Sequence, residues 1–252
     1  MSDSGAARDA ATSAEAEDDR APQAGDRRDQ VVGAEADRAA AELPEPRFRV
    51  AGDRALLIEL ASNSEVHRFA AAVRDQLAGR VEDVVPGHVT VLVSVAAGRP
   101  PLAELRQILA ALPGQAPEPV SDELTFRVRY DGPDLHDVAT YTGLSPEAVC
   151  RRHAAPLYTA AFLGFAPGFA YLIADGAPAD AASVEIPRRS TPRVMVPGGA
   201  VAVAGRYSAI YPSPGPGGWQ IIGHCDAPLF DSHRQPPSLL QPGSRVRFES
   251  VS

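Results

Sequence analysis

The chain beyond residue 46 begins with an alternation of short apolar strands and amphipathic helices. The segment FRVAGDRALLIEL, residues 48–60, predicts two strands joined at Gly52-Asp53. Residues 63–77 repeat apolar side chains at helical spacing, which predicts a helix with Asn63 as its N-cap. The predicted buried face of this helix comprises Val66, Phe69, Ala70, Val73 and Leu77.

Two more strands and a second helix follow. The segment VEDVVPGHVTVLVSV, residues 81–95, predicts two strands broken at Pro86-Gly87, and PLAELRQILAAL, residues 101–112, has the apolar stripe of a helix. This order of elements is close to a split βαβ arrangement, so we expect a small ferredoxin-like α/β domain over residues 47–118. The segment PGQAPEP, residues 113–119, has the composition of a linker.

The second half of the chain has a different pattern. After a predicted strand at 124–130, a helix should end at Gly143, and Ser145-Pro146 should start the next one. Residues 157–248 are short apolar alternations separated by Gly and Pro, a pattern typical of a β-barrel. We therefore expect an α+β chain whose second domain, residues 120–252, is largely a barrel.

The stretch VMVPGGAVAVAGRYSAIYPSPGPGGWQIIGH, residues 194–224, raises the question of linker or functional surface. Apolar residues alternate up to Gly205-Arg206 and resume from Tyr207, which predicts two strands joined by a two-residue hairpin turn. Because the glycines and prolines lie between and at the ends of the predicted strands, we interpret the stretch as barrel wall. Its SPGPGG loop, residues 213–218, is the expected rim of a groove.

The formal charge of −8 is concentrated before the folded part. Residues 1–46 hold twelve acids and five arginines, hence −7, and contain few large apolar side chains. Such a segment favours a disordered acidic tail, with an interaction arm as the alternative. The remaining −1 gives no electrostatic footprint for nucleic acid or an anionic membrane, so neither is an expected partner.

Residue usage excludes several chemistries. All 24 basic residues are arginine, so the chain has no phosphate-loop, Schiff-base or biotin-carrying lysine. Its two cysteines, Cys150 and Cys225, are 75 positions apart and form no CxxC pair, which favours a reduced, cytoplasmic setting. The sequence has neither the apolar core of a signal peptide nor a membrane-spanning run. No metal site is expected, because the cluster His224, Cys225, Asp226, Asp231 and His233 fits no zinc spacing.

Seven motifs together resemble a known family: YDGPDL, GLSPEAVCRRH, GFAPGFAYL, PRRSTPRVMVPGGAVAVAG, IYP, PGGWQIIG and LLQPGSRVRF. The family includes the B subunit of 5-oxoprolinase, allophanate hydrolase subunit 1, the matching part of urea carboxylase and KipI-like inhibitors of a histidine kinase. The resemblance covers residues 48–248. It implies an α/β domain followed by a cyclophilin-like β-barrel of carboxyltransferase type.

The resemblance also implies an activity shared by several subunits. Together with an A subunit and a sister C subunit similar to allophanate hydrolase subunit 2, the chain would cleave 5-oxo-L-proline to L-glutamate with ATP hydrolysis. ATP would be the co-substrate of the complex, with Mg²⁺ as a further candidate, although no recognisable ATP motif occurs in this chain. The alternatives are a non-enzymatic inhibitor of a sensor histidine kinase and a component of allophanate hydrolase or urea carboxylase.

Two residues are candidate catalytic groups. Arg193 lies in a proline-stiffened segment, where its guanidinium could grip a carboxylate or phosphate, or could pair with a neighbouring acid. His153 matches a family histidine, and histidine is the side chain whose ordinary pKa lies near neutrality, which suits catalysis. Its place at the end of a predicted helix also has a purely structural explanation.

Candidate substrate-binding residues follow the remaining motifs. Aromatic members could line a groove or simply pack in the core. The sequence departs from the family at His224-Cys225, where Arg-Thr is common, and at Ala200, where serine is common. The candidates are Phe165, Pro167, Gly168, Arg188, Pro197, Gly198, Gly199, Tyr211, Gly217, Gly218, Trp219 and His224.

Overall fold

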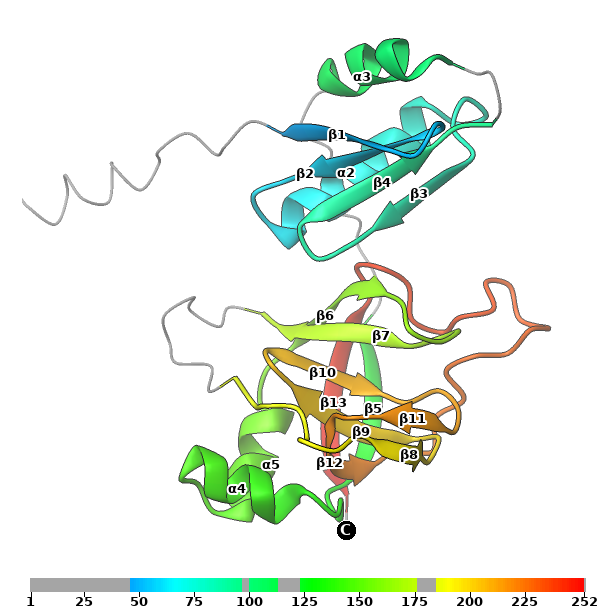
Figure 1. Ribbon diagram of the computed structural model, residues 1–252. Helices are drawn as coiled ribbons and strands as arrows, with labels where there is room; N and C mark the ends of the chain where they lie inside the picture. The colour runs from blue at the N-terminus through cyan, green and yellow to red at the C-terminus, as the bar shows by residue number, and fades with distance from the viewer. Residues whose placement is uncertain (1–45, 97–99, 113–122, 176–184, 252) are drawn as a thin grey trace, which may run out of the picture. The chain divides into compact units, whose positions relative to one another are not determined.

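The computed structural model describes residues 46–96, 100–112, 123–175 and 185–251, which form a small α/β domain and a β-barrel (Figure 1). This is the predicted fold class. The predicted linker at 113–119 and all but the last residue of the acidic segment lie outside the described residues.

The α/β domain contains a four-stranded antiparallel sheet. Its strands are β1 (Arg47–Ala51), β2 (Ala55–Glu59), β3 (Asp83–Pro86) and β4 (Thr90–Ser94), in the order β1-β2-β4-β3. Because β4 lies between β2 and β3, the unit β2-α2-β3 is a split βαβ, as predicted.

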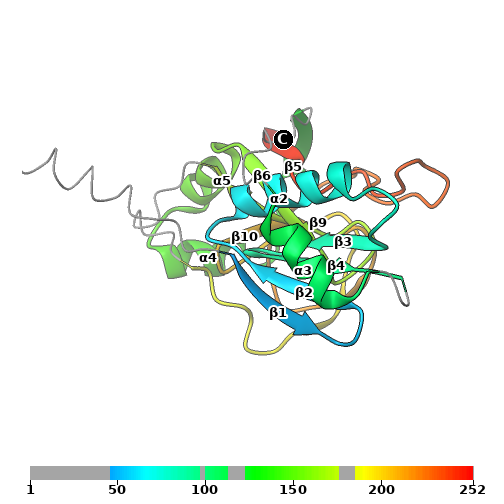
Figure 2. The same ribbon diagram turned by 90° about the horizontal axis from the view of Figure 1, so that it is seen from above.

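One face of this sheet carries the domain's core. Helices α2 (Asn63–Gln76) and α3 (Leu102–Ala110) share a buried apolar cluster with the strands. Figure 2 shows both helices on the same face of the sheet. The prediction of Asn63 as N-cap is wrong: Ser62 caps α2, with its hydroxyl accepting from the Glu65 amide at 3.2 Å. Ser62 has the extended backbone of a cap, whereas Asn63 is already helical.

The barrel is closed by seven strands in the order β10-β7-β6-β13-β5-β12-β9. Its strand β5 pairs in parallel with β13 along its full length. Outside the barrel, β8 (Arg193–Val196) and β11 (Gly215–Gly217) form a two-stranded sheet. The barrel strands are β5 (Glu123–Arg129), β6 (Tyr158–Leu163), β7 (Ala170–Ala174), β9 (Ala200–Ala204), β10 (Tyr207–Ile210), β12 (Gln220–His224) and β13 (Arg245–Val251).

Two helices follow β5 with the predicted caps. Helix α4 (Leu135–Thr142) ends at Gly143, which adopts a left-handed φ of 68°. Helix α5 (Pro146–Ala154) starts after Ser145, whose hydroxyl accepts from the Ala148 amide at 3.2 Å. Among the helices that the structure describes, none combines the length and apolar composition needed to cross a membrane.

The glycine-rich stretch is barrel wall, as predicted. Tyr207 pairs with Ala204 across the two-residue turn Gly205-Arg206. Along β9, Val201 faces the barrel's interior core, whereas Ala200, Ala202 and Ala204 face a second cluster. The small alanine side chains leave room for large aromatic rings on that outer face.

Candidate functional site

Several predicted substrate-binding residues gather around the outer face of β9, β10 and β12. The rings of Phe169, Tyr211 and Trp219 pack there edge to face, with centroids of Phe169 5.2 Å from Tyr211 and 5.6 Å from Trp219. We call this cluster the aromatic face. All three rings are at least 95% buried, so they support the surface from below.

Phe165 stands above the aromatic face with strained backbone. Its side chain is 62% exposed, although its ring contacts Phe169 and Tyr211 at centroid distances of 5.2 and 6.2 Å. Its φ of 71° makes it the one non-glycine residue in the left-handed region among those described. A bulky residue adopts this conformation at a cost, and such strain concentrates at functional surfaces.

Three more large apolar side chains of the second domain are exposed, in β8 and in the loop that contacts Gly168. Val194 and Met195 project from β8, and Phe230 lies beside Gly168 in the turn that carries Phe165. Figure 1 shows the β6–β7 turn, β8 and β11 on the same side of the barrel. We call Phe165, Val194, Met195 and Phe230 the apolar rim. The predicted residues Pro197, Gly198, Gly217 and Gly218 lie in or next to the turns that flank β8 and β11.

Arg188 is the available cation near this rim. Its side chain is exposed, and its charge acts on Tyr211. Burial raises the pKa of the Tyr211 hydroxyl, and the positive charge of Arg188 partly offsets this rise. Within residues 185–251 and the other described ranges, no ion pair occupies Arg188. Among the described residues its guanidinium therefore has no carboxylate partner, and a guanidinium of this kind can bind an anion.

Arg193 has an internal partner instead. Its two terminal nitrogens donate to the carboxylate of Asp134 at 2.8 and 2.7 Å, and Arg189 donates to the same group at 2.6 Å. The amide of Ile221 adds a fourth hydrogen bond, at 2.7 Å. Asp134 is 1% exposed, so this is a buried carboxylate neutralised by two arginines.

The pairing keeps Asp134 ionised. Burial raises the pKa of this carboxyl, but hydrogen bonds from Arg193 and the Ile221 amide, together with both guanidinium charges, bring it below its usual value. Sequence reasoning did not select Asp134, although it lies in the YDGPDL motif. One signal was available in the sequence. The three arginines of one motif needed an acidic partner, and Asp134 is an acid of another motif.

His153 is enclosed by its own network. Its Nδ1 lies 2.8 Å from the Tyr130 hydroxyl and its Nε2 lies 2.7 Å from the Ser208 hydroxyl. The ring also packs against Phe248 at a centroid distance of 4.5 Å. Since both nitrogens are engaged inside the barrel, the geometry favours a structural role. Burial lowers the pKa of His153 to about 3, so the ring is neutral at physiological pH.

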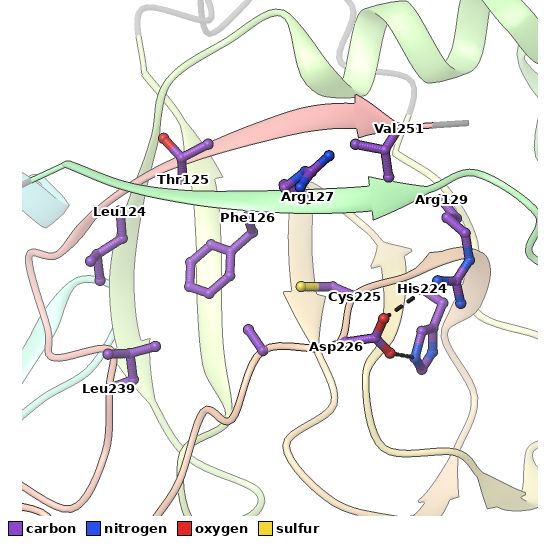
Figure 3. A pocket seen from close by; sticks show the side chains of 11 residues that line it. Leu124, Thr125, Phe126, Arg127, Arg129, His224, Cys225, Asp226, Leu239 and Val251 are labelled. Atoms are coloured by element: carbon purple, nitrogen blue, oxygen red, sulfur yellow. Dashed lines mark hydrogen bonds and ion pairs between the residues drawn. The ribbon is translucent and has the colours of Figure 1, made fainter.

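His224 lies apart from the aromatic face, at the end of β12. Its Nε2 is 2.8 Å from the Asp226 carboxylate, and both line a groove with a volume of about 510 Å³ (Figure 3). Nowhere in the part of the chain that the structure describes are three His, Cys, Asp or Glu side chains placed to hold a metal ion.

Comparison with known proteins identifies the family. A model of the carboxyltransferase domain, subdomain C and D, matches residues 46–240. The chain is 36% identical over 218 residues to the 5-oxoprolinase B subunit of Escherichia coli O157:H7, which covers 80% of this chain and 94% of that protein. The chain belongs to this carboxyltransferase-domain family.

Further relatives agree with this assignment. The 5-oxoprolinase B subunit of Bacillus subtilis (strain 168) is 41% identical over 121 residues, covering 48% of each chain. TTHA0988, whose crystal structure is known, is 36% identical in sequence and superposes with a TM-score of 0.66. The match covers 79% of this chain and 40% of the TTHA0988 chain. The urea amidolyase of Kluyveromyces lactis shares the fold, with a TM-score of 0.63 and 17% sequence identity. The match covers 84% of this chain and 16% of that protein.

We predict that Asp134→Asn lowers the free energy of unfolding by about 3–5 kcal/mol, the usual effect of removing one partner from a buried ion pair. The two arginines would lose their counter-charge in a poorly hydrated site. Chemical denaturation at pH 7.5 measures this. The matched control is Asp131→Asn, an exposed acid on the same segment, which should change stability by less than about 0.5 kcal/mol. Equal effects in both variants would contradict the assignment.

We predict that His153 makes stability fall as the pH is lowered. Between pH 6.5 and about 3 the unfolded chain binds a proton at this site and the folded chain does not, so the free energy of unfolding decreases with falling pH. From pH 7.5 to 5 the contribution is about 2 kcal/mol. Denaturation curves of the parent and of His153→Gln should therefore differ in pH dependence by this amount. Identical dependence would mean that folding does not lower the pKa of His153, and would contradict the prediction.

Proposed function

We propose that this chain is the B subunit of an ATP-dependent 5-oxoprolinase, which cleaves 5-oxo-L-proline to L-glutamate together with the A and C subunits. The observation that carries this proposal is the 36% identity to the Escherichia coli B subunit over 94% of that protein's length. Opening the lactam ring replaces its C–N bond with a C–O bond from water, and ATP hydrolysis drives the reaction. ATP use belongs to the assembled enzyme in this proposal.

The apolar rim supports a role within a complex of several chains. Phe165, Val194, Met195 and Phe230 are each 41–87% exposed. The β6–β7 turn that carries Phe165 and the strand β8 that carries Val194 and Met195 lie on the same side of the barrel (Figure 1). Gathered apolar side chains of this size typically mark a protein interface, because burying them against a partner is favourable. We assign this surface to the sister C subunit.

The arginines divide into two roles under this proposal. Arg189 and Arg193 position the β8 segment by holding Asp134, so we assign them to positioning. Arg188, with no ion pair among the described residues, would contact an anion at the edge of the interface. In the proposed reaction, the carboxylate of 5-oxoproline and the phosphate groups of ATP are such anions.

The activity test uses the assembled enzyme. We predict that the chain purified with the A and C subunits encoded by the same organism forms glutamate from 5-oxoproline, with ADP released in step. Omitting the chain should abolish glutamate formation. A complete, correctly folded complex that forms no glutamate would contradict the proposed function, and omission with no loss of activity would contradict the chain's part in it.

We predict that the double substitution Phe165→Asp and Met195→Asp weakens binding to the C subunit tenfold or more, because two charges would have to be desolvated at the interface. Aspartate tolerates the left-handed backbone at position 165, so the fold should survive. Titration by interferometry measures the dissociation constant. The matched control is Val50→Asp, a similarly exposed valine on β1 of the other domain. Unchanged binding of the double variant would exclude the rim as the interface.

A further inference from the structure

The groove that His224 and Asp226 line opens where the barrel wall is incompletely paired. Strand β5 pairs with β13 at every residue, but its other neighbour, β12, meets it only at Arg129 opposite His224. Beside the unpaired part of β5 lies the groove of about 510 Å³. Its volume is in the usual range for small-molecule sites.

The groove has an apolar length and a cationic end. Figure 3 shows Phe126 and Leu239 along one part of it and His224 with Arg129 at the other. The sulfur of Cys225 also lines the wall. Such a combination suits a ligand with an apolar body and one anionic group, since polar groups at one end fix its orientation.

The cationic end already holds a carboxylate. One oxygen of Asp226 lies 2.8 Å from Nε2 of His224, and the other lies 3.4 Å from Nη1 of Arg129. The Asp226 side chain is 76% exposed, and exposed ion pairs of this kind contribute little to stability. A carboxylate from a ligand could therefore take its place with small loss.

Arg127 adds a second guanidinium. It lies two positions before Arg129 on β5, so both side chains leave the same face of the strand. Arg129 is also 3.8 Å from Asp131, whereas Arg127 has no ion pair among the residues that the structure describes. The groove thus retains one guanidinium without a carboxylate partner.

Gly199 fixes the position of His224. With a φ of 81°, it lies so close to His224 that an added Cβ would be 2.5 Å from Cε1 of the imidazole. The ring is seated against the Gly199 backbone, which directs Nε2 toward Asp226. Two residues of the predicted site, Gly199 and His224, therefore act together at this groove.

We infer that this groove binds a small carboxylic acid. The carboxylate replaces that of Asp226 between His224 and Arg129, Arg127 supplies further charge, and a compact apolar body lies toward Phe126 and Leu239. The identity of the acid rests on the proposed function, which supplies 5-oxoproline as substrate and glutamate as product. 5-Oxoproline fits the class better because its ring carries no second charge.

Calorimetric titration of the full chain tests the ligand class. We expect 5-oxo-L-proline to bind at least tenfold more tightly than 2-pyrrolidinone, which has the same lactam ring without the carboxylate. Titrations with glutamate and glutarate show whether the groove prefers 5-oxoproline or binds small carboxylates in general. Competition by either compound supports binding of a small carboxylic acid. Equal affinity for 5-oxoproline and 2-pyrrolidinone, or binding of neither, would overturn the inference.

Substitutions test the site. We expect Asp226→Asn to tighten 5-oxoproline binding at least threefold, because the competing carboxylate is removed, and Arg129→Gln to weaken it at least tenfold. A purely structural role for these residues would not produce opposite signs. Arg151→Gln, an exposed arginine on α5, is the matched control, and thermal melting checks that each variant folds. Unchanged affinity in both groove variants would overturn the inference.

The outcomes separate this inference from the proposed function. If the assembled complex converts 5-oxoproline but the groove variants bind it like the parent, only the groove assignment fails. If the groove binds the carboxylate as described but a complete complex forms no glutamate, only the proposed activity fails.

Discussion

The buried carboxylate of Asp134 holds together three segments around the candidate site of the second domain. It precedes α4, yet its side chain does not cap that helix. Instead, Asp134 exchanges two hydrogen bonds with Ile221 of β12, its amide donating to the carbonyl at 3.0 Å and its carboxylate accepting from the amide at 2.7 Å. The Asp134 carboxylate also accepts hydrogen bonds from Arg189 and Arg193. Because an unpaired buried charge is costly, these three segments are ordered together.

Most elements of the fold could be predicted because they depend on local signals. Cap and turn residues correctly predicted the end of α4 at Gly143, the start of α5 after Ser145 and the hairpin at Gly205-Arg206, and the order of elements predicted the split βαβ. The misplaced cap at α2 came from two adjacent residues, Ser62 and Asn63, that are both good caps. Only the backbone of Ser62 resolves that choice.

The site was less accessible to sequence reasoning because its contacts join residues far apart in the chain. Arg193 and Asp134 are 59 positions apart, so the acid that neutralises the motif arginines could not be read from their neighbourhood. His153 shows the same limit, since its partners Tyr130 and Ser208 come from different parts of the barrel and together bury the ring. Spacing identified residues of chemical interest, whereas burial and partners distinguish those that hold the fold from those left available.

The aromatic face and the carboxylate groove share one stretch of backbone. The Gly199 amide donates to the carbonyl of Tyr211 at 2.7 Å, and the Gly199 carbonyl accepts from the Cys225 amide at 2.8 Å. Tyr211 supports Phe165 of the rim, while Cys225 and the neighbouring His224 line the groove. Interiors this closely packed transmit small displacements, so the proposed partner at the rim and the proposed ligand in the groove would both act on Gly199, Tyr211 and Cys225. A side chain at Gly199 would collide with the Cys225 carbonyl and the His224 ring and so disturb both surfaces, which requires glycine here for a reason beyond its φ of 81°.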